Sequence, residues 1–245
     1  MDRNLLSYGL QYACYFIEAG LVVYLAQRRQ HRKQGSVAFY LCSLLAADVA
    51  RACVLHAYGL TSLRYFYVYW STDFLLVISA FLLVCFLFRR ACRGEEKLWR
   101  FVRLLLLFAF ILVVGISGLI FSHNYRALFP YFVFEFNQNL YFACLVLNTL
   151  LYLLLQQIDS ADDQLGLLVC GVGIQFAGPA ATLALVHLTT AGPFALALNS
   201  FSMPVCTLGM LLVWAYAIVH VKGKASAVTR RQIPAFAQVT AGLNV

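Results

Sequence analysis

Residues 48–73 read DVARACVLHAYGLTSLRYFYVYWSTD and join two long apolar stretches through the short turn YGLTS. Three charged side chains stand inside these apolar stretches: Asp48, Arg51 and Asp73. A charge at the centre of a bilayer costs roughly 2.5–3.5 kcal/mol on insertion scales, so we expect all three to face protein, water or one another. The stretch therefore predicts two adjacent, antiparallel membrane helices that carry charged groups into the interior of a bundle.

The rest of the chain is equally apolar. Of its 245 residues, 62% are hydrophobic and 11% are charged, and the mean hydropathy of +0.80 lies outside the range of soluble domains. Stretches long enough to cross a bilayer recur at residues 6–26, 36–58, 64–88, 101–122, 131–155, 164–188 and 197–220. We therefore predict an all-α polytopic membrane protein, with seven transmembrane helices in residues 1–222 and a short, basic, flexible cytoplasmic tail in residues 223–245.

The positions of the basic residues predict the orientation of the bundle. Of the 18 Lys and Arg, 14 lie on one side of the predicted membrane, three lie on the other, and Arg51 lies within a helix. Because the cytoplasmic side carries the excess, we expect the N-terminus outside and the C-terminus in the cytoplasm, in the plasma (inner) membrane of a bacterium. The net charge of +8 is thus topological, and the expected partner is the lipid bilayer and not nucleic acid. The acidic loop at residues 159–163 is a candidate to pair with a neighbouring basic loop.

Polar side chains gather in the outer half of the predicted bundle. An intramembrane charge network is expected among Glu18, Asp48, Arg51 and Asp73, with Arg51 paired to Asp73 across the tight outer turn. A candidate ligand site follows from the same concentration of polar groups; its residues are Arg51, Asp73, Glu135, Gln138, Asn139, Gln175 and Asn199.

Two interpretations of these polar groups stay open. In one, the side chains satisfy one another as a structural network between helices. In the other, they line a cavity open to the outside, where several carboxylates and one arginine favour a cation or a proton. Four carboxylates cannot all be ionised cheaply in a dry interior, so we expect at least one to hold a proton or to reach water.

Known chemistries find little support in the sequence. Retinal proteins need a lysine in the last helix, and residues 197–220 contain none. Zinc-protease, nucleophile-elbow and phosphate-loop patterns are lacking, so no catalytic residues are predicted. The histidines fall near the predicted interfaces, and we expect no cofactor and no metal site.

Four features together give the chain a resemblance to a family. Glu18, Arg51, the run YFYVYW followed by Asp73, and Glu135 resemble the pattern of an uncharacterised family of seven-helix integral membrane proteins common in acidobacterial genomes. That family is associated with Glu where this chain has Asp73. The resemblance covers essentially the whole chain and implies fold and membrane location, but no activity.

Our functional hypothesis is a receptor-like, non-enzymatic membrane module. It would bind a small ligand, an ion or a partner helix in the outer half of the bundle, either for sensing or as a subunit of a membrane complex with a membrane or cytoplasmic protein partner. The alternative is a proton- or cation-coupled transporter that uses the intramembrane carboxylates.

Overall fold

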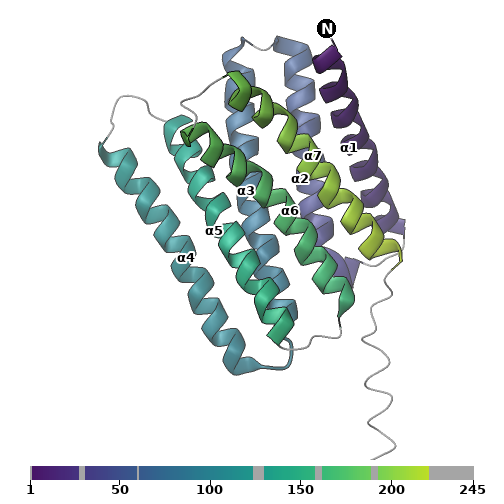
Figure 1. Cartoon of the computed structure of the whole chain (residues 1–245), viewed down its shortest axis with the longest axis vertical. Coiled ribbons are helices and arrows are strands. Elements are labelled where there is room, and N and C mark those ends of the chain that lie inside the picture. Colours follow the sequence, from purple (N-terminus) through teal and green to yellow (C-terminus); the bar gives the residue numbers. More distant parts are fainter. Residues whose placement is uncertain are drawn as a thin grey trace, which may run out of the picture.

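The computed structural model describes residues 2–27, 31–59, 61–123, 130–157, 162–188 and 193–220. Within these residues the chain forms seven long helices (Figure 1), and the tail at residues 223–245 lies outside the described part. Their bounds are α1 Asp2–Gln27, α2 His31–Tyr58, α3 Leu63–Ala91, α4 Glu96–His123, α5 Pro130–Gln157, α6 Asp163–Leu188 and α7 Pro193–Val219. The prediction of an all-α bundle is confirmed, and each helix begins before the apolar stretch that predicted it.

Six of these helices are long and apolar enough to cross a membrane: α1 to α5 and α7. Helix α6 contributes a shorter apolar segment, Asp163–Gly178, within its described residues. Apolar side chains also cover much of the outer surface, as on α4, where Phe101, Leu104, Phe108 and Ile111 are all more than half exposed. Such a surface fits hydrocarbon and not water, so the chain is a membrane protein.

The turn inside the quoted stretch has local causes. Gly59 follows the end of α2 with φ of +74°, a left-handed conformation that glycine adopts without a steric penalty. Ser62 then caps α3, because its hydroxyl oxygen accepts a 3.1 Å hydrogen bond from the backbone N–H of Tyr65. The short connection leaves α2 and α3 packed side by side along their length.

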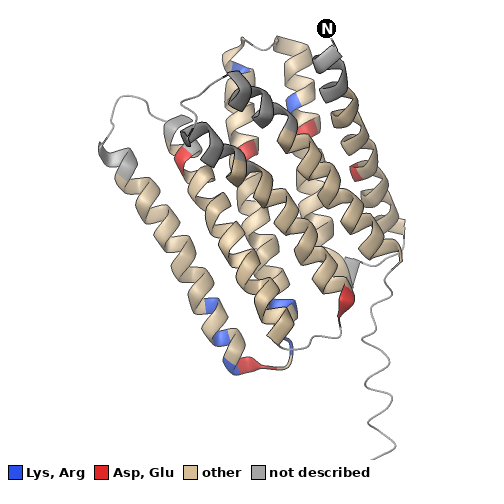
Figure 2. Ribbon diagram, in the orientation of Figure 1, with Lys and Arg blue, Asp and Glu red and all other residues tan. Residues whose placement is uncertain are grey.

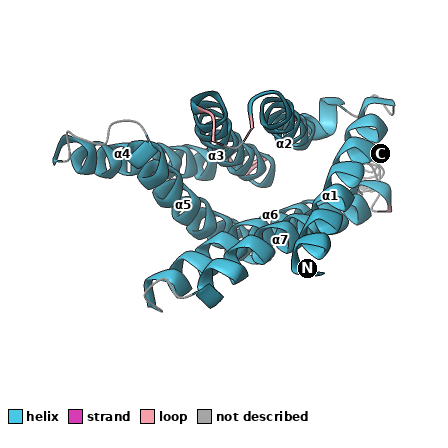
Figure 3. Cartoon of the chain, turned by 90° about the horizontal axis from the view of Figure 1, so that it is seen from above, coloured by secondary structure: helices cyan, strands magenta, loops and turns pink. Residues whose placement is uncertain are grey.

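Six helices form a closed ring in the order α1, α2, α3, α5, α6 and α7, with α7 returning to α1. Helix α4 stands outside this ring and packs mainly on α5 (Figure 3). Helices α2 and α7 also contact each other through side chains, because the ring of Tyr40 makes an edge contact with Trp214 at a centroid distance of 5.8 Å. The centre of the ring is therefore bordered by all helices except α4.

Close packing of α6 on α7 depends on small residues. A Cβ added to Gly171 would lie 2.6 Å from the indole of Trp214, which is fully buried and donates a 3.0 Å hydrogen bond from Nε1 to the carbonyl of Leu168. Gly178 similarly faces Cys206. Glycine at these two positions lets the helices approach closely.

A polar cluster connects the helices at the end of the bundle opposite the α2–α3 turn. Arg90, at the end of α3, forms a 2.8 Å ion pair with Asp162 and donates a 3.1 Å hydrogen bond to the amide oxygen of Gln164. Gln164 in turn donates a 3.0 Å hydrogen bond to the carbonyl of Ala217 on α7. This end carries most of the basic positions in Figure 2. The expected pairing of the acidic loop with a basic loop is confirmed.

Candidate functional site

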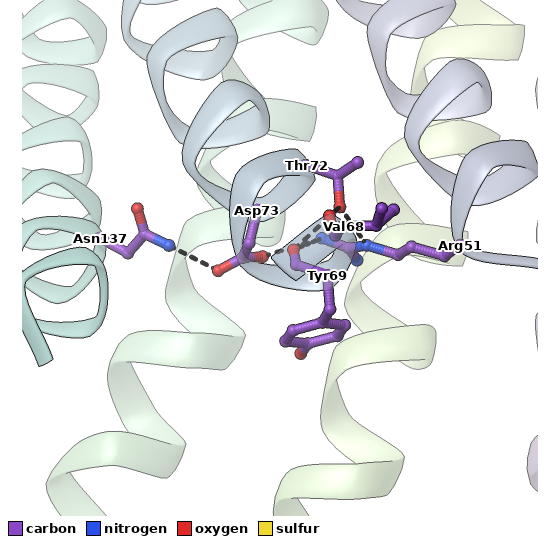
Figure 4. Close-up of polar contacts among 6 residues, drawn as sticks. All are labelled: Arg51, Val68, Tyr69, Thr72, Asp73 and Asn137. Carbon is purple, nitrogen blue, oxygen red and sulfur yellow. Dashed lines mark hydrogen bonds and ion pairs between the residues drawn. The ribbon is translucent and has the colours of Figure 1, made fainter. Parts of the chain in front are cut away.

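Arg51 is held by three partners on the neighbouring helix. Its Nε donates a 2.7 Å hydrogen bond to the hydroxyl of Thr72, and its Nη2 lies 3.3 Å from Oδ1 of Asp73 and 3.4 Å from the carbonyl oxygen of Tyr69 (Figure 4). The guanidinium also lies 4.6 Å from the centre of the Tyr69 ring. The predicted pair between Arg51 and Asp73 is confirmed, and it clamps α2 to α3.

The second oxygen of Asp73 has a different partner. Asn137 on α5 donates a 2.6 Å hydrogen bond from Nδ2 to Oδ2 of Asp73, so the carboxylate lies between Asn137 and Arg51 (Figure 4). Asn137 is buried and was not among the predicted site residues. The sequence held a signal for it, because it stands inside the polar run at residues 135–139. Thr72 and Tyr69 were also not predicted as partners of Arg51, because the prediction considered charged partners and neither residue is charged.

A cavity of about 240 Å³ lies beside this cluster, inside the six-helix ring. Its walls come from α1, α2, α3, α5, α6 and α7. The predicted residues that line it are Glu18, Asp48, Arg51, Asp73 and Gln175. The whole expected charge network thus borders one cavity, as the second interpretation of the sequence required.

Glu18 is the most deeply buried acid of this cavity. Its side chain is 1% exposed, and its Oε2 has no hydrogen-bond partner within the described part of the chain. The amide oxygen of Gln175 is also buried without a hydrogen-bond partner among the described residues. Buried polar atoms are normally paired, so two unpaired oxygens on residues that line one cavity show hydrogen-bonding capacity that the described protein groups do not satisfy.

Four tyrosines give the cavity an aromatic wall. Tyr15, Tyr40, Tyr69 and Tyr141 all line it, and the hydroxyl of Tyr15 accepts a 2.7 Å hydrogen bond from the amide of Gln11. Tyr141 is fixed by an edge contact with Phe176, at a centroid distance of 5.9 Å. Phenol rings present both a polar hydroxyl and a negative π face. The wall therefore suits a ligand that is small and positively charged.

Several predicted residues lie elsewhere. Glu135 and Gln138 are partly exposed and do not line the cavity, while Asn139 turns toward α4 and donates a 3.2 Å hydrogen bond to Ser117. These three residues lie on α5, which packs against α3, α4 and α6, so its successive side chains face different neighbours. The side chain of Asn199 lies outside the described residues.

Among the described residues, no group of three or more His, Cys, Asp or Glu side chains could hold a metal ion. His56 is exposed, and His220 packs on the ring of Tyr216. The side chains of His31, His123 and His187 fall outside the described residues.

Comparison of the chain with family models, with curated proteins and with solved structures gave no match. The resemblance to the uncharacterised seven-helix family therefore stays a prediction. The cavity of the six-helix ring is therefore the feature that indicates a function.

Proposed function

We propose that this protein is a non-enzymatic membrane module that binds a small cationic ligand or ion in the cavity of the six-helix ring. The observation that carries the proposal is the buried Glu18, whose carboxylate has an unpaired oxygen beside that cavity. In this proposal the chain crosses the plasma membrane seven times with its N-terminus outside, so that the cavity lies toward the outer surface. It serves as a sensor or as a subunit of a membrane complex.

The charges of the cavity support a cation over an anion. Arg51 forms its ion pair with Asp73, and neither Glu18 nor Asp48 forms an ion pair within the described residues. Both acids lie within electrostatic reach of each other. A bound cation would compensate this excess of negative charge in a site of low polarity.

The size and the aromatic wall narrow the ligand further. A volume of about 240 Å³ is below the usual range of roughly 300–1,000 Å³ for drug-sized ligands. An ammonium or a small amine would fit, with its charge near the carboxylates and its carbon atoms against the tyrosine rings. Thr207 and Gln175 add hydrogen-bonding groups that could orient such a molecule.

Cys14 offers a direct test, because its thiol lines the cavity. Purified protein in detergent would be treated with 2-aminoethyl methanethiosulfonate, which is cationic, and with the anionic 2-sulfonatoethyl reagent. We expect Cys14 to react faster with the cationic reagent. The ratio of the two rates cancels the intrinsic reactivity of the thiol, and mass spectrometry of the Cys14 peptide measures each rate.

Cys206 provides the internal reference, since it lies on α7 but faces Gly178 and does not line the cavity. The rate ratio at Cys14 should exceed that at Cys206, and it should fall in the variant Glu18→Gln/Asp48→Asn. A rate ratio at Cys14 that is the same in this variant as in the wild type would overturn the proposal. Equal rate ratios at Cys14 and Cys206 would contradict the proposed preference of the cavity for cations.

Coupled transport is the second candidate function, favoured by the position of Glu18 and Asp48 at one cavity. Because Glu135 does not line that cavity, a relay would use Glu18, Asp48 and Asp73 alone. Proteoliposomes that enclose a pH-sensitive dye would separate the two functions. A transporter would dissipate an imposed proton gradient when tetramethylammonium is added outside, whereas a binding module would leave the gradient unchanged. Tetramethylammonium has no neutral form that could cross the bilayer and dissipate the gradient by itself.

A further inference from the structure

A second pocket lies at the opposite end of the bundle from the α2–α3 turn. It has a volume of about 620 Å³ and is bordered by the start of α2, the end of α3, the turn after α3 and the start of α4. Its charged and aromatic lining consists of Phe86, Arg89, Arg90, Arg93, Glu96 and Trp99. The six-helix cavity shares none of these residues, so the two sites are separate.

The three arginines of this pocket are not equivalent. Arg90 is committed to Asp162 and Gln164 and is only partly exposed, so it acts as part of the framework. Arg89 and Arg93 are exposed, and neither forms an ion pair within the described residues. Gly94, with φ of +111°, allows the tight turn that keeps Arg93 close to the end of α3. Two guanidinium groups thus remain available, against one carboxylate from Glu96.

We propose that this pocket binds the phosphate of an anionic lipid headgroup. Guanidinium groups match phosphate oxygens in charge and in geometry, and two on adjacent turns can engage one phosphate together. Basic pockets at the ends of membrane helices are recurrent sites for such headgroups. The proposal does not depend on what the six-helix cavity binds.

The neighbours of the arginines favour a lipid over free phosphate. Trp99 and Phe86 line the same pocket, and Phe86 is 46% exposed on the apolar length of α3. Tryptophan is enriched at the depth of lipid headgroups, where its ring meets both water and acyl chains. A lipid could place its phosphate at Arg89 and Arg93 and its chains along Phe86, whereas free phosphate would leave the aromatic wall unused.

Native mass spectrometry of the full-length protein in detergent tests the proposal. Phosphatidylglycerol, phosphatidylcholine and inorganic phosphate would be added separately, and bound molecules counted as mass adducts. We expect one phosphatidylglycerol to be retained in preference to phosphatidylcholine. Replacing both exposed arginines, in Arg89→Gln/Arg93→Gln, should weaken that binding by roughly 25-fold, at about fivefold for each charge removed.

The matched control is Lys97→Gln/Arg100→Gln, which removes two exposed basic residues from the same end of the molecule but not from the pocket. This variant should retain the lipid nearly as well as the wild type. An equal loss of lipid binding in both double variants would attribute the binding to general surface charge and would overturn the proposed lipid site. Retention of inorganic phosphate to the same extent as phosphatidylglycerol would overturn the assignment to a lipid. A thermal unfolding curve for each variant confirms that the protein is folded.

Discussion

Asn137 donates a 2.6 Å hydrogen bond to Asp73, on the opposite oxygen of the carboxylate from Arg51. Asp73 therefore joins α5 on one side to α2 on the other, and it does so at the wall of the six-helix cavity. A carboxylate with both oxygens occupied is fixed in place. Glu18, in the same cavity, has an oxygen without a partner in the described part of the chain. The two acids of the cavity therefore differ: both oxygens of Asp73 are paired, whereas one oxygen of Glu18 is not.

Removal of the positive charge at Arg51 should destabilise the protein. In Arg51→Leu, Asp73 keeps its bond to Asn137 but loses its counter-ion, and Thr72 loses the guanidinium donor. The two charged side chains are 20% and 25% exposed, so we expect a loss of roughly 2–3 kcal/mol, below the 3–5 kcal/mol of a fully buried pair. Thermal unfolding in detergent would measure it.

Two variants show whether this loss comes from the ion pair. Arg64→Leu removes an arginine that stacks on Tyr58 at 4.6 Å but is exposed in the first turn of α3, and it should leave the melting temperature nearly unchanged. The double variant Arg51→Leu/Asp73→Leu removes both charges and should recover part of the stability. If the double variant is less stable than Arg51→Leu alone, the unpaired carboxylate is not the cause.

Asn137→Leu should also destabilise the protein, although no charge is removed. The substitution takes a donor from a carboxylate that is only partly exposed, and we expect a loss of roughly 1–2 kcal/mol. Gln138→Leu is the matched control, because Gln138 is the next residue on the same helix and is only partly buried. A similar loss in both variants would indicate a general effect of the first half of α5 and would contradict a specific role for Asn137.

The sequence predicted the ion pair but not the amide beside it, and the reason is physical. A charged pair in a membrane has few alternatives, so Arg51 and Asp73 on adjacent helices could be matched from their positions alone. Asn137, Gln138 and Asn139 are successive residues of one helix, and each residue is rotated by about 100° from the last. Only the rotation of α5 in the bundle decides which of them faces Asp73, and that rotation depends on packing with three neighbouring helices.

The cavity shows the same limit of sequence-based prediction. Glu18 and Asp48 were expected in a charge network, and both line the cavity. Glu135 was expected in the site because it shares their polarity, but it lies outside the ring interior. The position of α4 outside the ring did have a signal in the sequence, since residues 104–121 hold no charged side chain and Ser117 is the only polar one. Polarity predicted which residues avoid lipid, but not which helix face meets the cavity.

Gly171→Ala should weaken the packing of α6 on α7. The added Cβ would lie 2.6 Å from the indole of Trp214, whose position is fixed by its hydrogen bond to Leu168. Overpacking of this kind costs roughly 1–3 kcal/mol. Gly166→Ala is the matched control on the same helix, because nothing lies within 4 Å of its Cβ position. It should be neutral or stabilising by roughly 0.5–1 kcal/mol, since alanine favours helix. Equal melting temperatures for the two variants would contradict the close contact.

The last prediction concerns Glu18 and separates stability from binding. Glu18→Met replaces a carboxylate that is 1% exposed by an apolar side chain of similar length. Whether the acid is ionised or protonated, an unpaired polar group disappears from the interior, and we expect a gain of roughly 1–3 kcal/mol in the free energy of unfolding. The same substitution should reduce the preference of Cys14 for the cationic thiol reagent, because Glu18 is lost from the cavity and only Asp48 remains of the two acids without an ion pair.

Gln34→Met is the control for this result. Gln34 is 2% exposed, neither atom of its amide group has a partner in the described residues, and it does not line the six-helix cavity. Its replacement should stabilise the protein to a similar degree but leave the labelling of Cys14 unchanged. A protein that retains an acid at a cost in stability does so where function requires it. If Glu18→Met instead lowers the melting temperature, the carboxylate has an internal partner, and the cavity would then be closed by the protein's own hydrogen bonds and not by a ligand.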